Sequence, residues 1–172
     1  PHIGIITNIG EAHIENFKNL NGIAKAKGEL IKNIKKNGTL ILNRDDQYFN
    51  YFKKRAKLKN LRVISFGISK KSDVYPISFK RNKKDKKLTF KICDQILKIK
   101  AKNLNIHNIL ATLALLKVLN LNFFESASRF KNFQPSEGRG KIYNIERYKK
   151  KFKLIDESYN ANPLSVKNAI KN

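Results

Sequence analysis

Four groups of polar residues could carry chemistry, because each lies at the end of a predicted strand or helix and not along its face. The first spans residues 7–13 and ends in His13, which could ligate a metal or could simply be capped or solvated. The second, residues 25–29, lies on a predicted helix and includes Lys25 and Lys27; an ordinary salt-bridged helix face would have the same composition. Residues beyond the carboxyl ends of parallel strands line the usual ligand crevice of an open α/β sheet.

Two further groups lie in the second half of the chain. His107 and Asn108 open a predicted helix, where capping alone could account for them. The last group joins residues 137–140 with residues 156–163 and is a dense run of hydrogen-bonding side chains after a predicted strand. Such a run reduces the stability of the fold unless something polar is held there, so we predict a binding site in this group.

Several kinds of catalytic centre are excluded by the residue inventory. One cysteine and three histidines do not supply a zinc-spaced Cys/His set or a chymotrypsin-like triad, and no paired-acid glycosidase arrangement is evident. The sequence also lacks a GxxxxGK[ST] phosphate loop. If the protein binds a nucleotide, its phosphate loop must lie outside these residues.

The net charge of +24 suggests a nucleic-acid-binding module, but lysines supply 30 of the 37 basic residues and asparagine is also abundant. A phosphate-binding groove would favour arginine interleaved with aromatic residues. The densest basic run, residues 80–87, lacks that interleaving. The composition is typical of an adenine- and thymine-rich genome, so we expect lysine-rich solvated surfaces and no specific nucleic-acid partner.

The 172 residues are 41% hydrophobic, which is enough for one compact domain. No apolar run is long enough to span a membrane, and the lone Cys93 suits a reducing compartment, so we expect a cytoplasmic protein. The chain starts at Pro1 and stops directly after a helix-like run, which we interpret as a fragment of a longer protein.

The elements that would position these groups alternate between strands and helices. Apolar runs at residues 3–7, 39–42 and 62–66 predict parallel strands, and residues 23–34 and about 46–57 predict the helices between them, with residues 43–46 as the N-cap of the second. The later pattern predicts an antiparallel meander with strands at residues 74–79, 87–92 and 95–99, followed by helices at residues 105–120 and 123–130. Two further strands are predicted at residues 142–148 and 152–155, and a final helix at residues 163–170. The fold class is therefore α/β, with a mainly parallel sheet, flanking helices and a small antiparallel meander.

Taken in order, six strings resemble the Mur ligase family. They are ITNIGEAHIENF (residues 6–17), GIAKAKGEL (22–30), LNRDD (42–46), IHNILATLAL (106–115), EGRG (137–140) and IDESYNANPLSV (155–166). The SYNANP string is most similar to the branch of the family that joins D-alanyl-D-alanine to UDP-N-acetylmuramoyl-tripeptide. Another Mur ligase or a folylpolyglutamate-type ligase is the alternative, and a basic nucleic-acid-binding module is a further one.

The resemblance implies an ATP-dependent, ADP-forming amide ligase that works through an acyl-phosphate intermediate. It implies a role in peptidoglycan synthesis, and so in cell wall biogenesis, cell shape and cell division. It implies a partial central ATP-binding domain over residues 1–148, and the end of that domain with the start of the C-terminal ligase domain over residues 149–172. Without the phosphate loop and the other domains, the fragment is expected to be inactive alone. A monomer is expected.

The resemblance also assigns roles to residues. His13 matches a Mg²⁺ ligand. Lys27 matches a lysine that is carbamylated in the complete enzyme, and the carbamate oxygens are also Mg²⁺ ligands. Asn108 matches a residue near the adenine of ATP, with His107 beside it. The remaining matches are Arg139 for the nucleotide phosphates, Glu157 for the ribose, where many relatives have aspartate, and Tyr159 and Asn160 at the domain junction.

Overall fold

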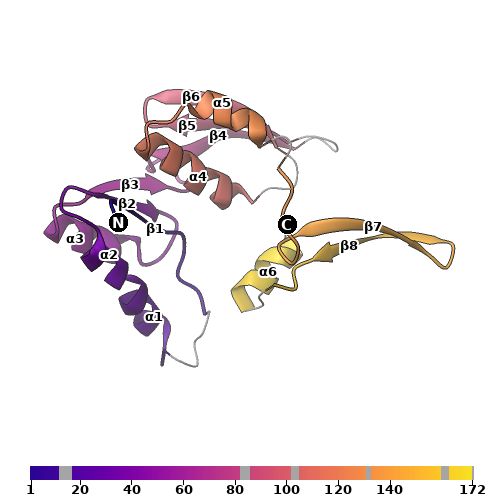
Figure 1. Ribbon diagram of the computed structural model, residues 1–172, viewed down its shortest axis with the longest axis horizontal. Coiled ribbons are helices and arrows are strands. Elements are labelled where there is room, and N and C mark those ends of the chain that lie inside the picture. The colour runs from indigo at the N-terminus through magenta and orange to yellow at the C-terminus, as the bar shows by residue number, and fades with distance from the viewer. Residues whose placement is uncertain (12–16, 82–85, 102–104, 131–132, 160–162, 172) are drawn as a thin grey trace. The chain divides into compact units, whose positions relative to one another are not determined.

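The computed structural model describes residues 1–11, 17–81, 86–101, 105–130, 133–159 and 163–171. The chain forms two compact units, residues 1–132 and residues 133–172, which are described separately below (Figure 1). No helix in these described ranges is long and apolar enough to cross a membrane.

The first unit is built on one six-stranded sheet whose strands lie side by side in chain order. The strands are β1 (Ile3–Ile6), β2 (Thr39–Asn43), β3 (Arg62–Phe66), β4 (Val74–Arg81), β5 (Lys86–Ile92) and β6 (Gln95–Ala101). Strands β1 to β4 pair in parallel, whereas β4, β5 and β6 pair antiparallel. The predicted α/β fold, with a parallel sheet and an antiparallel meander, is therefore confirmed, and the meander continues the same sheet.

Helices connect and cover these strands. They are α1 (Leu20–Lys27), α2 (Glu29–Asn33), α3 (Phe49–Leu58), α4 (Ile106–Val118) and α5 (Phe123–Arg129). The single helix predicted over residues 23–34 is wrong in two respects, because the helical segment starts earlier, at Leu20, and is divided at Gly28. A Cβ on Gly28 would lie 3.1 Å from the carbonyl oxygen of Ala24 and 3.4 Å from the ring of Phe52 on α3, so the missing side chain permits this close packing.

The N-cap predicted at residues 43–46 is also wrong. Helix α3 begins at Phe49, and its N-cap position is Tyr48, which makes no side-chain capping bond. The carboxylates of Asp45 and Asp46 accept hydrogen bonds from loop amides before and after them in the chain. These acids therefore join loops instead of starting a helix.

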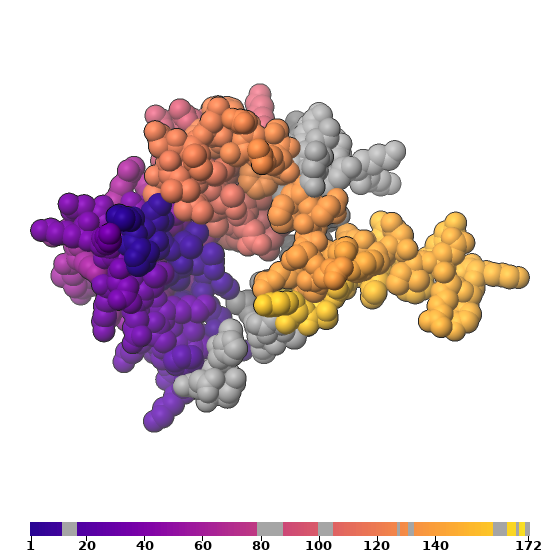
Figure 2. All heavy atoms as spheres, in the orientation of Figure 1, coloured from indigo at the N-terminus to yellow at the C-terminus, as the bar shows by residue number. Residues whose placement is uncertain are grey.

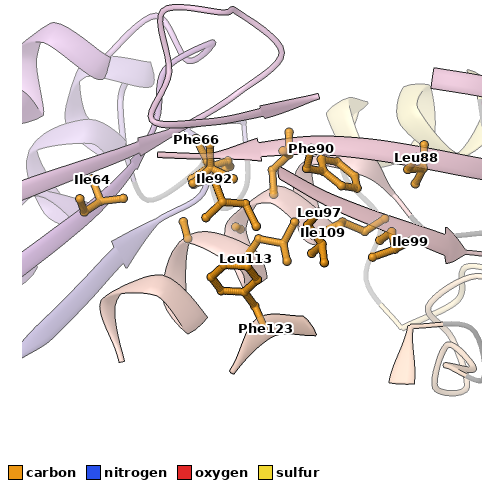
Figure 3. Close-up of a cluster of buried hydrophobic side chains, with 14 of the residues drawn as sticks. Ile64, Phe66, Leu88, Phe90, Ile92, Leu97, Ile99, Ile109, Leu113 and Phe123 are labelled. Carbon is orange, nitrogen blue, oxygen red and sulfur yellow. The ribbon is translucent and has the colours of Figure 1, made fainter. Parts of the chain in front are cut away.

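The sheet separates two hydrophobic cores. Leu40 and Leu42 of β2 pack with residues of α1, α2 and α3, whereas Ile41 packs with residues of β3 to β6 and α4. Figure 3 shows the second of these cores, in which Phe66, Phe90 and Ile92 from the sheet gather near Leu113 of α4. All five side chains of β2 are buried, as expected for a parallel strand covered on both faces.

The second unit is a hairpin followed by a helix. Strands β7 (Lys141–Arg147) and β8 (Lys150–Asp156) pair antiparallel, and α6 spans Pro163–Lys171. Tyr148 and Lys149 form the turn with positive φ angles of 53° and 60°, which matches the two-residue turns that suit the twist of a hairpin. In the space-filling view the second unit is elongated along this hairpin (Figure 2). The expected domain boundary at residues 148 and 149 falls in this turn, and that boundary stays a prediction.

Candidate functional site

Polar residues gather at the carboxyl ends of β1, β2 and β3, where an open α/β sheet binds its ligands. The loop after β1 is fastened to the loop after β2, because the amide of Ile9 donates to Oδ2 of Asp46 at 2.7 Å. The side chain of Ile9 is buried in the core formed with α1 to α3. This edge of the sheet is therefore built by long-range contacts, and the loops are not independent of one another.

Lys27 reaches this edge from the last turn of α1. Its Nζ donates to the carbonyl oxygen of Asn8 at 3.2 Å. Lys25 lies two residues earlier on the same helix, about 200° around the helix axis, so it leaves from a different side. The structure thus distinguishes the two lysines, and it is Lys27 that contacts the loop after β1. The other predicted metal ligand, His13, lies outside the described residues.

Of the two ligands that the sequence resemblance implies for Mg²⁺, Lys27 lies among the described residues. Among them, no group of three or more His, Cys, Asp and Glu side chains could hold a metal ion. A carbamate on Lys27 would place anionic oxygens near the neutral carbonyl oxygen of Asn8, and a hard cation that prefers oxygen ligands could bind both groups. The chemistry of this position therefore fits the group that the sequence resemblance implies.

His107 and Asn108 lie in the first turn of α4. The side chain of Asn105 caps the helix, because its Oδ1 accepts from the amide of His107 at 2.9 Å and from that of Asn108 at 3.4 Å. Nε2 of His107 lies 3.3 Å from Oδ2 of Asp45 in the loop after β2. The predicted adenine-side residues therefore lie at the same edge of the sheet as the loop after β2.

In the second unit, the loop before β7 and the loop after β8 are joined by backbone hydrogen bonds, and we call them the interlocked loops. The amide of Gly140 donates to the carbonyl oxygen of Asp156 at 2.7 Å, and the amide of Tyr159 donates to that of Gly138 at 3.1 Å. Gly138 and Gly140 have φ angles of +71° and +89°, which glycine adopts without strain. The predicted fourth group, residues 137–140 with residues 156–159, is thus brought together.

The Asp156 carboxylate holds these two loops in place. One oxygen accepts from the amide of Gly138 at 2.8 Å, and the other accepts from the hydroxyl of Ser158 at 2.6 Å and from its amide at 3.1 Å. The bond from the Ser158 hydroxyl, followed by the bonds from the two amides, holds the pKa of Asp156 below its ordinary value. Beside it, a hydrogen bond and ion pair with Lys141 at 2.8 Å lowers the pKa of Glu137.

Arg139 and Glu157 project from these fastened loops. The guanidinium of Arg139 lies over the ring of Tyr159, 4.0 Å from the ring centre. A Cβ on Gly140 would lie 3.1 Å from Oε1 of Glu157, so that carboxylate packs directly against the glycine loop. A cation and a carboxylate on two loops that the hairpin brings together could bind the phosphates and the hydroxyls of a nucleotide. Asn160 lies outside the described residues.

Three acids that organise the loops of the candidate site were not singled out from the sequence. Asp45 and Asp46 were expected to cap a helix, and Asp156 was considered only as one member of a polar run. Asp45 and Asp46 lie two and three residues past the end of β2, and Asp156 is the last residue of β8. That position at the carboxyl edge was the available signal, since loops meet there and need acceptors for their amides.

Comparison with known proteins agrees with this arrangement. Residues 1–118 match the model of the Mur ligase middle domain. The chain is 34% identical over 176 residues to the UDP-N-acetylmuramoyl-tripeptide–D-alanyl-D-alanine ligase of Rickettsia prowazekii, which covers 99% of this chain and 38% of that protein. The chain therefore spans less than two fifths of the length of this relative.

Solved structures share the fold. The MurF enzyme of Acinetobacter baumannii superposes with a TM-score of 0.82 at 24% identity, over 97% of this chain and 36% of that one. The MurF ligase of Thermotoga maritima, solved in complex with ADP, superposes with a TM-score of 0.77 at 24% identity, over 99% of this chain and 38% of that one. At these identities the likeness shows the fold.

Proposed function

The chain belongs to the Mur ligase family, and from this premise we propose that it is part of an ATP-dependent ligase that joins D-alanyl-D-alanine to UDP-N-acetylmuramoyl-tripeptide. The observation that carries the proposal is the pair of interlocked loops, which gathers Arg139, Glu157 and Tyr159 where the sequence resemblance expects the nucleotide to bind. The similarity to a relative of that named activity over 99% of this chain supports the same choice of substrates.

The proposed reaction has two steps. The terminal carboxylate of the tripeptide attacks the γ-phosphorus of ATP, which forms an acyl phosphate and releases ADP. The amino group of D-alanyl-D-alanine then attacks the acyl carbon, and the tetrahedral intermediate collapses to an amide with loss of inorganic phosphate and a proton. Both steps concentrate negative charge on crowded oxygens, so fixed cationic groups accelerate them.

The described residues have distinct tasks in this scheme. Arg139, supported by the ring of Tyr159, would pair with phosphate oxygens, and Glu157 would accept a hydrogen bond from a ribose hydroxyl. Lys27, as a carbamate, and His13 would hold Mg²⁺, which supplies charge neutralisation at the phosphates when bound. Asn108 and His107 would lie at the base of the nucleotide.

The test is an assay of acceptor choice with the complete ligase that contains these residues. ADP should form with ATP, UDP-N-acetylmuramoyl-tripeptide and D-alanyl-D-alanine together, and the 172-residue chain alone should release none. A complete enzyme that instead used a single amino acid as acceptor would assign the chain to another branch of the family. Glutamate used with a folate would indicate the folylpolyglutamate-type alternative.

A nucleic-acid-binding role is a second candidate, and the net charge of +24 is the observation that favours it. Non-specific binding is almost entirely electrostatic and weakens steeply with salt, whereas specific binding also has base contacts and so remains stronger than non-specific binding at the same salt concentration. Titration of the chain with duplex DNA should therefore show only weak, salt-sensitive association. Submicromolar, sequence-dependent affinity at moderate salt would support the second candidate instead.

A further inference from the structure

Asp45 joins three segments that are far apart in the chain. It lies in the loop after β2, its Oδ2 accepts from the amide of Ile68 at 2.6 Å, and its Oδ1 accepts from the amide of Ser69 at 3.4 Å. The same Oδ2 lies 3.3 Å from Nε2 of His107 on α4. One carboxylate thus connects the loop after β2, the loop after β3 and the start of α4.

The loop after β3 leaves this carboxylate little freedom. A Cβ on Gly67 would lie 2.8 Å from Oδ2 and 2.9 Å from both Cγ and Oδ1 of Asp45, so the backbone of Gly67 packs directly against the carboxylate. The side chain of Asp45 is 28% exposed. Two amides and a close backbone contact therefore determine where its oxygens lie, independently of His107.

The backbone amide of His107 and its imidazole each have a hydrogen-bond partner. Its backbone belongs to the first turn of α4, where the amide donates to Oδ1 of Asn105. Its ring meets the fixed carboxylate of Asp45 through Nε2. An ionised carboxylate only accepts hydrogen bonds, so Nε2 must carry the proton, and in a neutral ring Nδ1 is then an acceptor.

We propose that Asp45 is a positioning residue for the base end of the nucleotide site, which holds His107 in the Nε2–H tautomer and so presents Nδ1 as a hydrogen-bond acceptor. This inference rests on the proposed function. An acceptor suits a purine with an exocyclic amine at position 6, which donates, and it disfavours a purine with a carbonyl oxygen there, which also accepts. Asp45 would thereby add to the selectivity for ATP, the nucleotide of the proposed function, over a nucleotide with a carbonyl oxygen at position 6.

The first test uses the 172-residue chain itself and needs no activity. The chain contains three histidines, and ¹⁵N-histidine NMR at about pH 8.5, above the ordinary histidine pKa, reports the tautomer of each ring. The variant His107→Gln identifies the signal. Wild-type His107 should be a single Nε2–H tautomer whose Hε2 proton exchanges slowly with water.

Variants of Asp45 separate positioning from general stability. Asp45→Asn keeps an oxygen that can accept from both Ile68 and His107, so it should retain the slow Hε2 proton. Asp45→Ala should remove it and leave a mixture of tautomers. The matched control is Asp46→Ala, which removes bonds to Ile9 and Tyr48 but none to His107, and it should leave the signal unchanged. An Nδ1–H tautomer in the wild type, or equal loss in Asp46→Ala, would overturn the proposal.

The second test measures base selectivity in the complete ligase with ATP and with ITP, in which a carbonyl oxygen replaces the 6-amino group. Asp45→Ala should lower the ratio of KM for ITP to KM for ATP by about fivefold, the value of one ordinary hydrogen bond, and Asp45→Asn should restore most of it. Equal increases in both KM values would mean that Asp45 only stabilises the loops. If neither nucleotide is used, the proposed function fails, whereas the tautomer result stands by itself.

Discussion

The guanidinium of Arg139 lies 4.0 Å from the centre of the Tyr159 ring, and the two residues come from loops on opposite strands of one hairpin. Next to this contact, the amide of Tyr159 donates a backbone hydrogen bond to the carbonyl oxygen of Gly138, which holds the two loops together. A planar cation on a ring face has fewer available orientations than a free one, so the stack prepares Arg139 for an anion before the anion arrives.

Replacing Tyr159 should therefore weaken ATP binding through Arg139. In the complete ligase, Tyr159→Ala should raise KM for ATP about two- to fivefold, the equivalent of about 0.5–1 kcal/mol for an exposed cation–π contact. Tyr159→Phe keeps the ring face and should have a KM close to that of the wild type. If Phe were as harmful as Ala, the hydroxyl and not the stack would be the functional feature.

Gly138 should not tolerate a side chain. Its φ of +71° disfavours other residues, and a Cβ would lie 2.7 Å from Cβ of Tyr159. Gly138→Ala should therefore separate the two loops, which is measured by faster hydrogen exchange of the Gly140 amide.

Gly22 provides a control of opposite sign. It lies in α1, and an added Cβ would find only ordinary contacts, the nearest at 3.4 Å. Gly22→Ala should stabilise the first unit by about 0.5–1 kcal/mol, because alanine is the better helix former.

For Gly138→Ala, hydrogen exchange of the Gly140 amide that is as slow as in the wild type would contradict the importance of the contact between the two loops.

The interlocked loops should loosen in acid. Hydrogen bonds hold the pKa of Asp156 below its ordinary value in the folded chain, so their stabilising effect is complete above the unfolded pKa of about 3.9 and is lost as the pH falls through the lower folded value. The amide chemical shifts of Gly138 and Ser158 should therefore change as the pH falls below the unfolded value of about 3.9.

Glu137 also has a lowered pKa and titrates nearby, so this experiment needs a matched pair of variants. Glu137→Gln should leave the acid transition of Gly138 and Ser158 in place, whereas Asp156→Asn should abolish it. A transition that followed Glu137 instead would assign the effect to its ion pair with Lys141.

Lys27 and Lys25 should differ sharply in the complete enzyme. Lys27→Ala or Lys27→Arg should reduce kcat about a hundredfold or more, because a metal ligand is worth several kcal/mol at the transition state. Lys25→Ala should have a much smaller effect, since it leaves α1 from a different side. A small carboxylic acid should partly restore Lys27→Ala but not Lys27→Arg, whose side chain still fills the space. Full activity of Lys27→Ala would refute the carbamate.

The sequence predicted most of the elements because the apolar runs were short and well separated. Strands such as β2 and β3 needed only their own residues to be recognised. The division between α1 and α2 at Gly28 was not predicted, because the apolar spacing continues through this position and the packing of Phe52 from another helix near Gly28 is not visible in the local sequence.

The candidate site was predictable to a lesser extent. Residues 137–140 and 156–159 were grouped correctly, since strand pairing in a hairpin brings the two ends together. The partners of Asp45 and Asp46 lie as far as 62 and 37 residues away in the chain, respectively. A local pattern of acids after a strand contains no information on such distant amides, so capping was the simpler but incorrect interpretation.

The complete burial of β2 has a consequence for how this chain finds its fold. Leu40, Ile41 and Leu42 are all inside, on alternating faces, so a strand misaligned by one residue would still place apolar groups in both cores. Hydrophobicity alone cannot reject that mistake. Polar contacts just beyond the strand can, because Asp46 accepts from the amide of Ile9 after β1 and Asp45 accepts from the amide of Ile68 after β3 when β2 is aligned natively with both neighbours. Fidelity of assembly therefore depends on the two aspartates that follow the strand more than on the leucines within it.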